Sequence, residues 1–385
     1  MAKKKIGVGL IGYNFMGKAH SNAYRQVNRF FDLPVEVELK AICGRNEQAV
    51  AAAAKAFGWE SYETDYRKLL ARKDIHLVDV SSPGNMHAPM AIAAAQAGKA
   101  VFCEKPLANT LSEAKQMLAA VKKAKVAHGL CHNYRRAPAV GLVKRFIEDG
   151  TLGKIYHFRA TYLQDWIMDP AFPLVWRLDK KVAGSGALGD LGAHIIDLAR
   201  YLVGEVTEVS ALTETFIKAR PKLESVGGGL GAKQGKATGK VTVDDCALFL
   251  GRFKGGAVGT FEATRFAGGR KNYNRFEING SGGSVVFNLE RLNELEYFNR
   301  SDSADRQGFR TIICNEGTHP YPVWWPSGHI IGYEHTFTNT VADLLVAMHE
   351  RKPFKPDFND GVRNNAVLDA VERAAKSKKW EKVTV

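Results

Sequence analysis

Apolar runs and amphipathic stretches alternate along the first third of the chain. Stretches with apolar residues at helical spacing separate short, nearly continuous apolar runs of strand length. The predicted strands are 6–11, 35–43, 75–81, 100–103 and 126–131, and the predicted helices are 17–30, 47–57, 87–97 and 110–125. Strands separated by helices of this length favour right-handed crossovers. The pattern therefore predicts an α/β fold with a doubly wound parallel sheet.

The pattern changes after Arg135. Short alternating segments, typical of strands with one buried face, now predominate. The predicted strands are 154–163, 206–216, 241–253, 257–263, 273–278 and 284–288, and the predicted helices are 138–148, 190–203, 333–350 and 360–377. We expect a second, α+β domain with a large, mostly antiparallel sheet, and divide the chain into 1–131 and 132–385. The Gly- and Lys-rich segment 221–240 is expected to be a flexible surface loop.

Composition narrows the class of protein. The 385 residues include 54 Lys and Arg against 40 Asp and Glu, which gives a formal net charge of +14. These basic residues are spread along the chain rather than gathered in one stripe, so we expect no nucleic-acid partner. The five cysteines form no CxxC pair, and no apolar run has membrane-spanning length. We expect a cytoplasmic protein with no membrane contact and no metal.

Glycines mark a phosphate-binding turn after the first strand. Gly7 and Gly9 fall inside the predicted strand, so the turn into the helix begins at Gly12. Gly12 permits a tight turn, Gly17 permits close packing of the helix on the strand, and N–H groups at the helix start can hold a pyrophosphate. Asn14, which tolerates positive φ, replaces the usual middle glycine. The predicted dinucleotide-binding residues of this turn are Gly12, Asn14, Phe15, Met16 and Gly17.

The end of the second predicted strand bears on the choice of cofactor. It reads Cys43-Gly44-Arg45-Asn46, without the acidic residue that would bind the adenosine ribose and repel a 2′-phosphate. Gly44 removes this repulsion and Arg45 can form charge-assisted hydrogen bonds to the phosphate, which slightly favours NADP. Arg45 can equally stack on the adenine while Asn46 binds the ribose, which leaves NAD acceptable.

Candidate catalytic residues occur in two places. Lys105 follows the predicted strand 100–103, at the carboxyl edge of the sheet, where ligands bind in such folds. Asp190 and His194 lie on one face of a predicted helix, beside an apolar stripe. A structural hydrogen-bonded pair is an alternative for these two residues. A metal site is not expected, because no third ligand is evident beside them.

These motifs together resemble the glucose-fructose oxidoreductase and inositol dehydrogenase (Gfo/Idh/MocA) family. The matching segments are 7–17, 82–87, 97–99, 104–106, 135–136, 176–177 and 184–197, spread over essentially the whole chain. The resemblance implies a Rossmann domain that binds NAD or NADP over 1–131, and a substrate-binding and oligomerisation domain over 132–385. It also implies catalysis by Lys105, Asp190 and His194.

Further contacts follow from the same resemblance. Residues that match family positions near the cofactor are Ser82, Pro83, His87, Glu104, Lys105, Trp176 and Arg177. Sugars need hydroxyl partners and an aromatic wall, and the candidates for substrate contact are Lys105, Tyr134, Gln164, Trp166, Asp190, His194 and Trp325. His194 is the best general base because its unperturbed pKa is near neutrality, while Lys105 would stabilise developing negative charge. Which of the two takes the proton is left open.

We therefore expect an NAD(P)-dependent dehydrogenase that oxidises a secondary hydroxyl of a cyclic sugar, an anhydrosugar or an inositol. The resemblance of segments 133–136, 162–166 and 200–205 to sugar-oxidising members of the family implies such a ring substrate. Two alternatives stay open: a non-catalytic sensor that binds a dinucleotide or a sugar, and an enzyme that retains its cofactor tightly, such as an NAD-dependent glycosidase. The resemblance also implies a homodimer or homotetramer.

Overall fold

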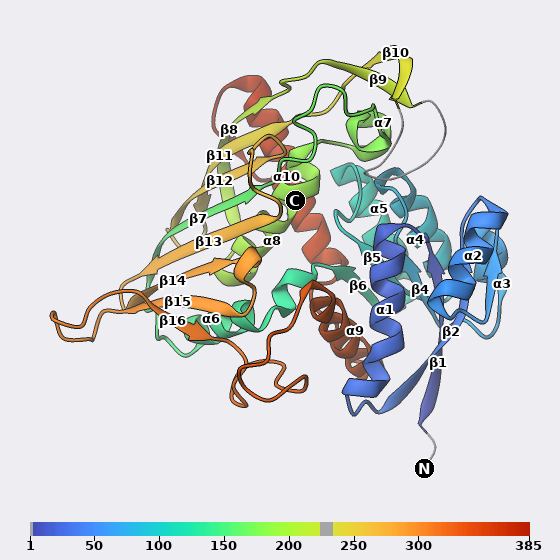
Figure 1. The fold of residues 1–385 in the computed structure, drawn as a ribbon, viewed down its shortest axis with the longest axis horizontal. Coiled ribbons are helices and arrows are strands. Elements are labelled where there is room, and N and C mark those ends of the chain that lie inside the picture. Colours follow the sequence, from blue (N-terminus) through green and yellow to red (C-terminus); the bar gives the residue numbers. More distant parts are fainter. Residues whose placement is uncertain (1–2, 224–233) are drawn as a thin grey trace. The chain divides into compact units, whose positions relative to one another are not determined.

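The computed structural model describes residues 3–223 and 234–385, and Figure 1 shows the path of the chain. The chain divides into two compact units. The parallel-sheet unit comprises Met1–Arg136 and Gly332–Arg363, and the mixed-sheet unit comprises Ala137–Ile331 and Asn364–Val385. This division differs from the predicted one, because Gly332–Arg363 packs with the first unit although it was assigned to the second domain.

Six parallel strands form the sheet of the parallel-sheet unit, in the order β3-β2-β1-β4-β5-β6. The strands are β1 (Lys4–Ile11), β2 (Val35–Cys43), β3 (Ser61–Glu63), β4 (Leu77–Val80), β5 (Ala100–Glu104) and β6 (His128–Cys131). The helices are α1 (Phe15–Phe30), α2 (Glu47–Phe57), α3 (Tyr66–Ala71), α4 (His87–Gln96), α5 (Leu111–Ala124) and α9 (Tyr333–Glu350). Helices α1, α2 and α9 contribute to the core on one face, and α3, α4 and α5 to the core on the other. The predicted doubly wound fold is confirmed.

Local sequence signals explain where these elements begin. Thr110 and Glu113 form the predicted capping box at the start of α5. Inside β1, a Cβ on Gly7 would lie 1.9 Å from the carbonyl oxygen of Asp74, so this glycine allows a close approach of backbone to the strand. Gly7 therefore serves the packing of the strand and takes no part in the turn that follows it.

Nine strands form the sheet of the mixed-sheet unit, in the order β16-β15-β14-β13-β7-β12-β11-β8-β17. Neighbouring strands are antiparallel except for the parallel pair β12 and β7. The strands are β7 (Ile155–Leu163), β8 (Val206–Glu214), β11 (Cys246–Phe253), β12 (Val258–Thr264), β13 (Tyr273–Gly280), β14 (Gly283–Asn288), β15 (Glu294–Asn299), β16 (Arg310–Ile313) and β17 (Glu381–Lys382). The helices are α6 (Pro138–Glu148), α7 (Lys180–Ala183), α8 (Ala193–Leu202) and α10 (Phe358–Ser377), whose first turns belong to the parallel-sheet unit. The predicted α+β fold is confirmed.

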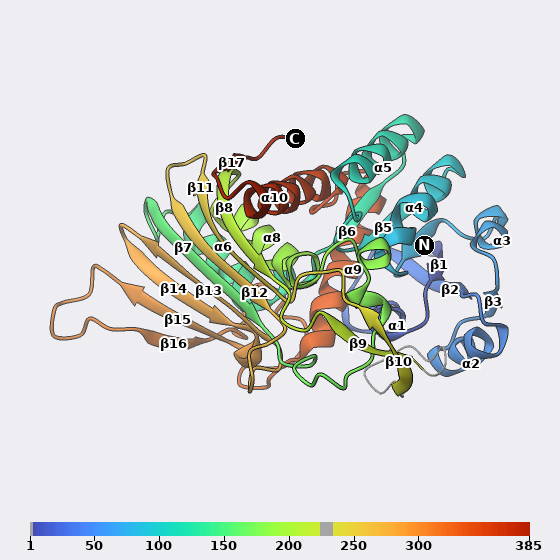
Figure 2. The ribbon, with the colours of Figure 1, turned by 90° about the horizontal axis from the view of Figure 1, so that it is seen from above.

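The two faces of this sheet differ in burial. Phe158, Phe261 and Phe276 are buried on the face that contacts α6 and α8, and Figure 2 shows α8 beside the strands. The ring of Phe158 lies 5.6 Å from that of Phe261 and 6.0 Å from that of Phe276. Apolar side chains exposed on the opposite face are Leu212, Leu248, Leu250 and Val258. The sheet thus has one covered face and one exposed face on which apolar side chains lie among charged ones such as Arg252 and Glu208.

Part of the segment expected to be a flexible loop is regular structure. The strands β9 (Ala219–Leu223) and β10 (Gln234–Lys240) pair in antiparallel fashion. The prediction of a flexible loop over 221–240 is therefore wrong at both ends of the segment, and 224–233 lies outside the described residues.

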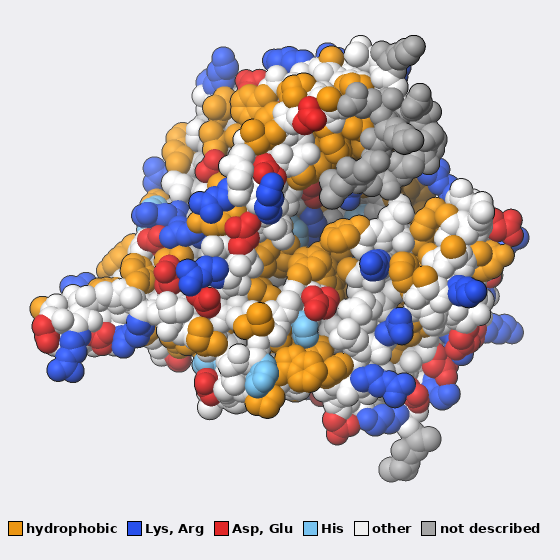
Figure 3. Space-filling model, viewed as in Figure 1, with side chains coloured by type: hydrophobic (Ala, Val, Ile, Leu, Met, Phe, Trp, Pro, Cys, Tyr) orange, Lys and Arg blue, Asp and Glu red, His pale blue; other side chains and the backbone are white. Residues whose placement is uncertain are grey.

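Charged residues intermingle on the surface. Figure 3 shows Lys and Arg scattered among Asp and Glu over the visible face, as their spacing along the chain predicts. Lys40, for example, bridges Glu38 at 2.9 Å and Glu60 at 3.0 Å. Within the described part of the chain, no helix combines the length and the apolar character that crossing a membrane requires.

Candidate active site

The turn between β1 and α1 has the geometry of a phosphate-binding loop. Gly12 has a φ of 118°, and a Cβ there would lie 2.5 Å from the carbonyl oxygen of Ser81. A Cβ on Gly17 would lie 2.2 Å from the carbonyl oxygen of Gly12. Both positions therefore need glycine, in agreement with the register read from the sequence.

The residues after Gly12 lead into an open helix start. Asn14 has a φ of −77°, so the turn does not use the tolerance of asparagine for positive φ, and the Asn14 side chain makes no capping hydrogen bond. The first N–H groups of α1, from Phe15 to Gly17, are donors that an α-helix cannot pair internally. Together with the positive end of the helix dipole, these groups suit an anion such as a pyrophosphate.

Two residues at the end of β2 have structural roles that the sequence did not show. A Cβ on Gly44 would lie 2.1 Å from a ring carbon of Tyr13, so glycine at this position makes room for that ring. The Asn46 side chain caps α2 by accepting a hydrogen bond from the N–H of Ala49 at 2.9 Å. The absence of an acidic residue at position 44 is thus explained by packing, without reference to a 2′-phosphate.

Two carboxylates lie near the end of β2, where Arg45 follows the strand. Arg45 is exposed. Burial raises the pKa of the Cys43 thiol to about 12, and the carboxylates of Asp65 and Glu63 add to that shift. The carboxylates of Glu63 and Asp65 therefore place negative charge beside Cys43, at the end of β2.

Lys105 follows directly on β5, at the carboxyl edge of the parallel sheet. Its side chain is half-buried, and its backbone N–H donates to Oε2 of Glu104 at 3.0 Å. Glu104 is buried with its other oxygen, Oε1, 2.9 Å from Nε2 of His20. Burial acts to raise the pKa of Glu104, but the His20 imidazole holds it below its usual value. Glu104 is therefore an ionised residue that orients the backbone of Lys105.

His87 is placed by backbone contacts on both sides of its ring. Its Nδ1 lies 2.9 Å from the carbonyl oxygen of Pro106, and its Nε2 lies 2.9 Å from that of Ser82. The residue is buried at the start of α4. Both ring nitrogens are thus engaged by the protein backbone, which argues against the predicted contact of His87 with a cofactor.

Asp190 and His194, unlike Lys105, belong to the mixed-sheet unit. Asp190 lies in a π-helical turn, Leu188–Gly192, that leads directly into α8. His194 is buried in the first turn of α8, with its ring centre 5.6 Å from that of Tyr162. The predicted helix 190–203 thus begins with a wider turn, a feature often found at functional sites.

A buried arginine holds Asp190. Arg265 follows β12, is 1% exposed, and donates through Nη2 to Oδ2 of Asp190 at 2.9 Å and to the carbonyl oxygen of Gly186 at 3.2 Å. Asp244 supports the same loop by accepting hydrogen bonds from the N–H groups of Gly186 and Leu188, both at 2.7 Å. The carboxylate of Asp190 is therefore fixed in orientation before any ligand binds.

Arg177 adds a second cation to this neighbourhood. Burial lowers the pKa of Arg177, the charge of Asp190 opposes this shift, and the charge of Arg265 reinforces it. Its guanidinium stacks 4.4 Å from the ring centre of Trp176, which is partly exposed. The predicted cofactor residues Trp176 and Arg177 are thus in the mixed-sheet unit, with Arg177 in electrostatic contact with Asp190.

Two of the predicted substrate contacts join the same cluster. Nε1 of Trp166 donates to Oε1 of Gln164 at 2.9 Å, and Nε2 of Gln164 donates to Oδ1 of Asn272 at 3.0 Å. The guanidinium of Arg265 lies 5.3 Å from the centre of the Trp166 ring. Gln164 and Trp166 are therefore linked through Arg265 to Asp190.

Two other predicted substrate contacts, Tyr134 and Trp325, have surroundings of their own. Tyr134 is buried in the parallel-sheet unit, where its ring packs 6.3 Å from that of Tyr333. Trp325 is 47% exposed in the segment between β16 and α9, and lines a groove of about 370 Å³ with Asn315 and Pro322. Their roles in substrate contact therefore stay predictions.

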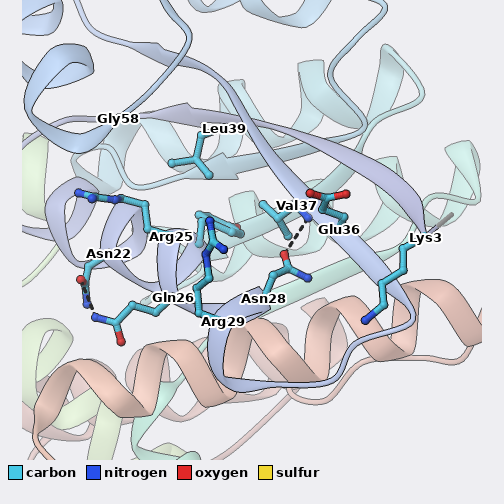
Figure 4. A pocket seen from close by; sticks show the side chains of 11 residues that line it. Lys3, Asn22, Arg25, Gln26, Asn28, Arg29, Glu36, Val37, Leu39 and Gly58 are labelled. Atoms are coloured by element: carbon cyan, nitrogen blue, oxygen red, sulfur yellow. Dashed lines mark hydrogen bonds between the residues drawn. The ribbon is translucent and has the colours of Figure 1, made fainter.

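A surface cavity of the parallel-sheet unit does not coincide with the candidate site. It measures about 690 Å³ and lies against α1 and β2, lined by residues such as Asn28, Arg25 and Arg29 (Figure 4). The Asn28 side chain accepts from the N–H of Val37 at 2.8 Å, so it fastens the helix to the strand. None of the residues that line this groove is among the predicted site residues.

Comparison with known proteins decides the family. Residues 6–132 match the family model described as an oxidoreductase family with an NAD-binding Rossmann fold, and residues 140–286 match the GFO/IDH/MocA C-terminal domain. The chain is 46% identical over 390 aligned residues to levoglucosan dehydrogenase from Pseudarthrobacter phenanthrenivorans, with 98% of each chain covered. The chain belongs to the Gfo/Idh/MocA family.

Solved structures of Gfo/Idh/MocA proteins share the whole fold. An oxidoreductase domain protein from Kribbella flavida superposes with a TM-score of 0.94 at 51% identity, covering 99% of this chain and 100% of the other. Levoglucosan dehydrogenase in complex with NADH and levoglucosan superposes with a TM-score of 0.94 at 45% identity, with the same coverage. This chain is thus an oxidoreductase of the family with an NAD-binding Rossmann domain, as its motifs predicted.

Sequence reasoning missed the residues that hold the candidate catalytic groups in this family member. Arg265 and Asp244 follow no recognisable spacing relative to Asp190, so the sequence offered no signal for them. His20 did offer one, because it shares the buried stripe of α1 with Ala23, Tyr24 and Val27. A histidine on an otherwise apolar stripe indicates either a satisfied core residue or a functional one.

His20 also takes part in a compact group with Glu104 and Cys131. Their potential ligand atoms lie within 4.8 Å of one another, and all three residues are buried. The two ring nitrogens of His20 already face carboxylates, Asp79 at 2.7 Å and Glu104 at 2.9 Å. Burial also raises the pKa of the Cys131 thiol, which disfavours the thiolate that binds metals. We therefore interpret this group as a hydrogen-bonded network.

Proposed function

We propose that the protein oxidises a secondary hydroxyl of a cyclic sugar, an anhydrosugar or an inositol with NAD as acceptor. The observation that carries the proposal is the 46% identity to levoglucosan dehydrogenase over 98% of both chains. The structure of levoglucosan dehydrogenase with NADH and levoglucosan supports a ring substrate, since its fold matches this chain with a TM-score of 0.94.

The residues of the first turn fit a dinucleotide. Gly12 and Gly17 form a cradle that a Cβ would fill, and the start of α1 offers N–H groups for the pyrophosphate. Bound NAD supplies the hydride acceptor. We assign pyrophosphate binding to the turn from Gly12 to Gly17, and nicotinamide binding to the loops that contain Ser82, Pro83 and Lys105.

Each proposed catalytic residue has one task. As hydride leaves the carbinol carbon, the hydroxyl proton must leave as well, and we assign its removal to His194. Lys105 hydrogen-bonds the same oxygen and stabilises its developing negative charge. Asp190, fixed by Arg265 at 2.9 Å, accepts a hydrogen bond from the substrate and orients it. Gln164 and Trp166 provide a polar group and an aromatic wall for the ring.

Two substitutions test these roles. Lys105→Ala and His194→Ala should each lower kcat by about 100-fold or more, the usual scale for losing acid–base assistance. The measurement is NADH formation with saturating NAD and a panel of levoglucosan, scyllo-inositol, myo-inositol and glucose. A wild-type enzyme that reduces neither NAD nor NADP with any of these compounds would refute the proposal. A purified protein that already contains non-exchanging cofactor would favour a cofactor-retaining enzyme instead.

NAD is the preferred cofactor in this proposal, against the slight preference for NADP read from the sequence. The carboxylates of Asp65 and Glu63, which raise the pKa of Cys43, place negative charge beside the end of β2. Such charge repels a 2′-phosphate. We expect kcat/KM to be at least about 10-fold higher with NAD, the scale of about 1.4 kcal/mol of repulsion. The charge-reversing variant Glu63→Lys should lower the ratio of kcat/KM with NAD to kcat/KM with NADP. Lys73→Glu, which reverses a charge on an exposed loop, is the control and should leave this ratio unchanged.

A homodimer or homotetramer is also part of the proposal. The apolar residues Leu248, Leu250 and Val258 on the exposed sheet face support association of two copies through that face. Sedimentation analysis of Leu250→Glu should show a smaller assembly than the wild type.

A further inference from the structure

Two buried histidines of the parallel-sheet unit connect the ends of β4 and β5. His20 is 0% exposed and His87 is 2% exposed. The backbone pairing of β4 with β5 ends at Val80 and Cys103, before Lys105 is reached. Beyond that pair, the two histidines provide links between the segments that follow each strand.

The first link runs through His20. Its Nδ1 lies 2.7 Å from Oδ2 of Asp79 in β4, and its Nε2 lies 2.9 Å from Oε1 of Glu104 at the end of β5. The second oxygen of Glu104 accepts the N–H of Lys105 at 3.0 Å. Tyr24 donates to the same Asp79 oxygen at 2.8 Å, which completes a buried network. A continuous chain of hydrogen bonds thus ends on the backbone of Lys105.

The charges in this network strengthen the hydrogen bonds of His20. Burial acts to lower the pKa of His20, but the Asp79 carboxylate raises it well above its usual value. An imidazolium between two carboxylates donates from both nitrogens, so each contact is a charge-assisted hydrogen bond. Such bonds define the position of Glu104 more tightly than neutral ones.

The second link runs through His87. Its Nδ1 lies 2.9 Å from the carbonyl oxygen of Pro106, after β5, and its Nε2 lies 2.9 Å from that of Ser82, after β4. Carbonyl oxygens only accept hydrogen bonds, so both contacts are hydrogen bonds only in the protonated ring, and the neutral ring, which the lowered pKa favours, donates to one carbonyl at a time. Burial of the protonated ring lowers the pKa of His87, and the two carbonyls oppose the shift.

We propose that His20 and His87 are positioning residues that hold Lys105 from both sides. His20 fixes the residue before Lys105 and His87 fixes the residue after it. The proposal rests on the catalytic role proposed for Lys105. Neither histidine touches the reacting atoms, and each acts by limiting where the Lys105 backbone can lie. A displacement of about 1 Å at such a residue can cost about 100-fold in rate.

A double-mutant cycle tests the proposal. The variants are His87→Leu, Lys105→Ala and the combination of both, and kcat is measured at saturating sugar and NAD. NADH titration by fluorescence gives the concentration of sites that bind cofactor. Expressing kcat per such site removes the contribution of misfolded protein. We expect His87→Leu to lower kcat by about 10- to 100-fold with little change in NADH affinity.

The decisive quantity is the effect of His87→Leu in the absence of Lys105. If His87 acts through Lys105, the substitution should lower the residual kcat of Lys105→Ala by less than about twofold, because the two residues are coupled. An equal loss in both backgrounds would overturn the proposal. A near-normal kcat in Lys105→Ala alone would instead refute the proposed function of Lys105, so the two failures are distinguishable.

Further variants separate positioning from folding. His87→Gln retains an N–H donor and should recover part of the activity lost in His87→Leu. His20→Gln, combined with Lys105→Ala in the same way, should show the same coupling. His76→Leu is the control at an exposed histidine of the same sheet, because His76 also holds backbone by accepting the N–H of Gly7 at 2.9 Å, and it immediately precedes β4. Its kcat should stay within about twofold of the wild type, and an equal loss there would show that any histidine removal in this sheet has the same effect.

Discussion

In the parallel-sheet unit the turn residues are placed by the backbone, and Lys105 by the strand it follows and by Glu104, whereas in the mixed-sheet unit Asp190 is held by an ion pair with the buried Arg265. In the first, Gly12 and Gly17 shape the turn, and Lys105 follows a strand whose neighbours fix its direction. In the second, Asp190 lies in a π-helical turn and is held by Arg265, 75 residues later in the chain. Side-chain changes at Asp190 or Arg265 should therefore impair substrate orientation and leave cofactor binding intact. Substitutions of Gly12 or Gly17 should impair cofactor binding first.

The largest expected effect is on the glycine turn. Gly12→Ala would force a Cβ to within 2.5 Å of the Ser81 carbonyl oxygen at a φ of 118°. Strain of this kind costs about 1–3 kcal/mol, so NADH should bind up to about 100-fold more weakly. Isothermal titration with NADH measures the loss.

Gly255→Ala is the control for this prediction, because a Cβ there meets nothing within 4 Å. Its NADH affinity should equal that of the wild type. Unchanged NADH affinity in Gly12→Ala would show that the backbone of the turn does not set cofactor binding, and the contrast between the two units would fail.

The difference between the units also explains what the sequence could reveal. The register of the turn and the position of Lys105 follow from local patterns, because a glycine before a helix and a residue after a strand have the same meaning in every doubly wound sheet. The contact of Arg265 with Asp190 has no local pattern, since it arises from the pairing of distant strands. The packing of α9 on the parallel sheet was missed for the same reason: Phe337 and Val341 indicate an apolar helix face without indicating its partner.

The next effect in size concerns Arg265. Arg265→Leu removes the donor that holds Asp190 and should lower kcat/KM for the sugar by about 100-fold, the scale of a small misplacement at a reacting centre. NADH affinity should stay within about twofold, because the residue belongs to the mixed-sheet unit. Arg265→Lys keeps the charge, but the lysine side chain is one atom shorter than the path to Nη2, the nitrogen that contacts both Asp190 and the Gly186 carbonyl, so an intermediate value is expected. Equal losses of NADH affinity and of kcat/KM would contradict the separation of roles.

The last effect concerns stability rather than catalysis, and it depends on pH through groups of the parallel-sheet unit. The pKa of His20 is raised above its usual 6.5 in the folded state, so its stabilisation is complete below about pH 6.5 and is lost as the pH rises through the raised pKa. The pKa of Glu104 is lowered below 4.5, so its contribution is lost only as the pH falls through that lowered value. The network of His20 and Glu104 should therefore stabilise the fold most strongly between about pH 4.5 and about pH 6.5.

Urea unfolding of the wild type and His20→Gln between about pH 5 and pH 10 measures this dependence. At neutral pH the variant should be about 3 kcal/mol less stable, because two buried carboxylates lose their shared partner. The difference should shrink as the pH rises and the wild-type His20 loses its proton. Tyr24→Phe removes one hydrogen bond to Asp79 without changing the charge of the network, so it should cost about 1 kcal/mol at every pH below the titration of tyrosine. A difference between wild type and His20→Gln that stays constant across the range would show that His20 is held neutral, and charge-assisted bonds would then no longer explain how Glu104 positions Lys105.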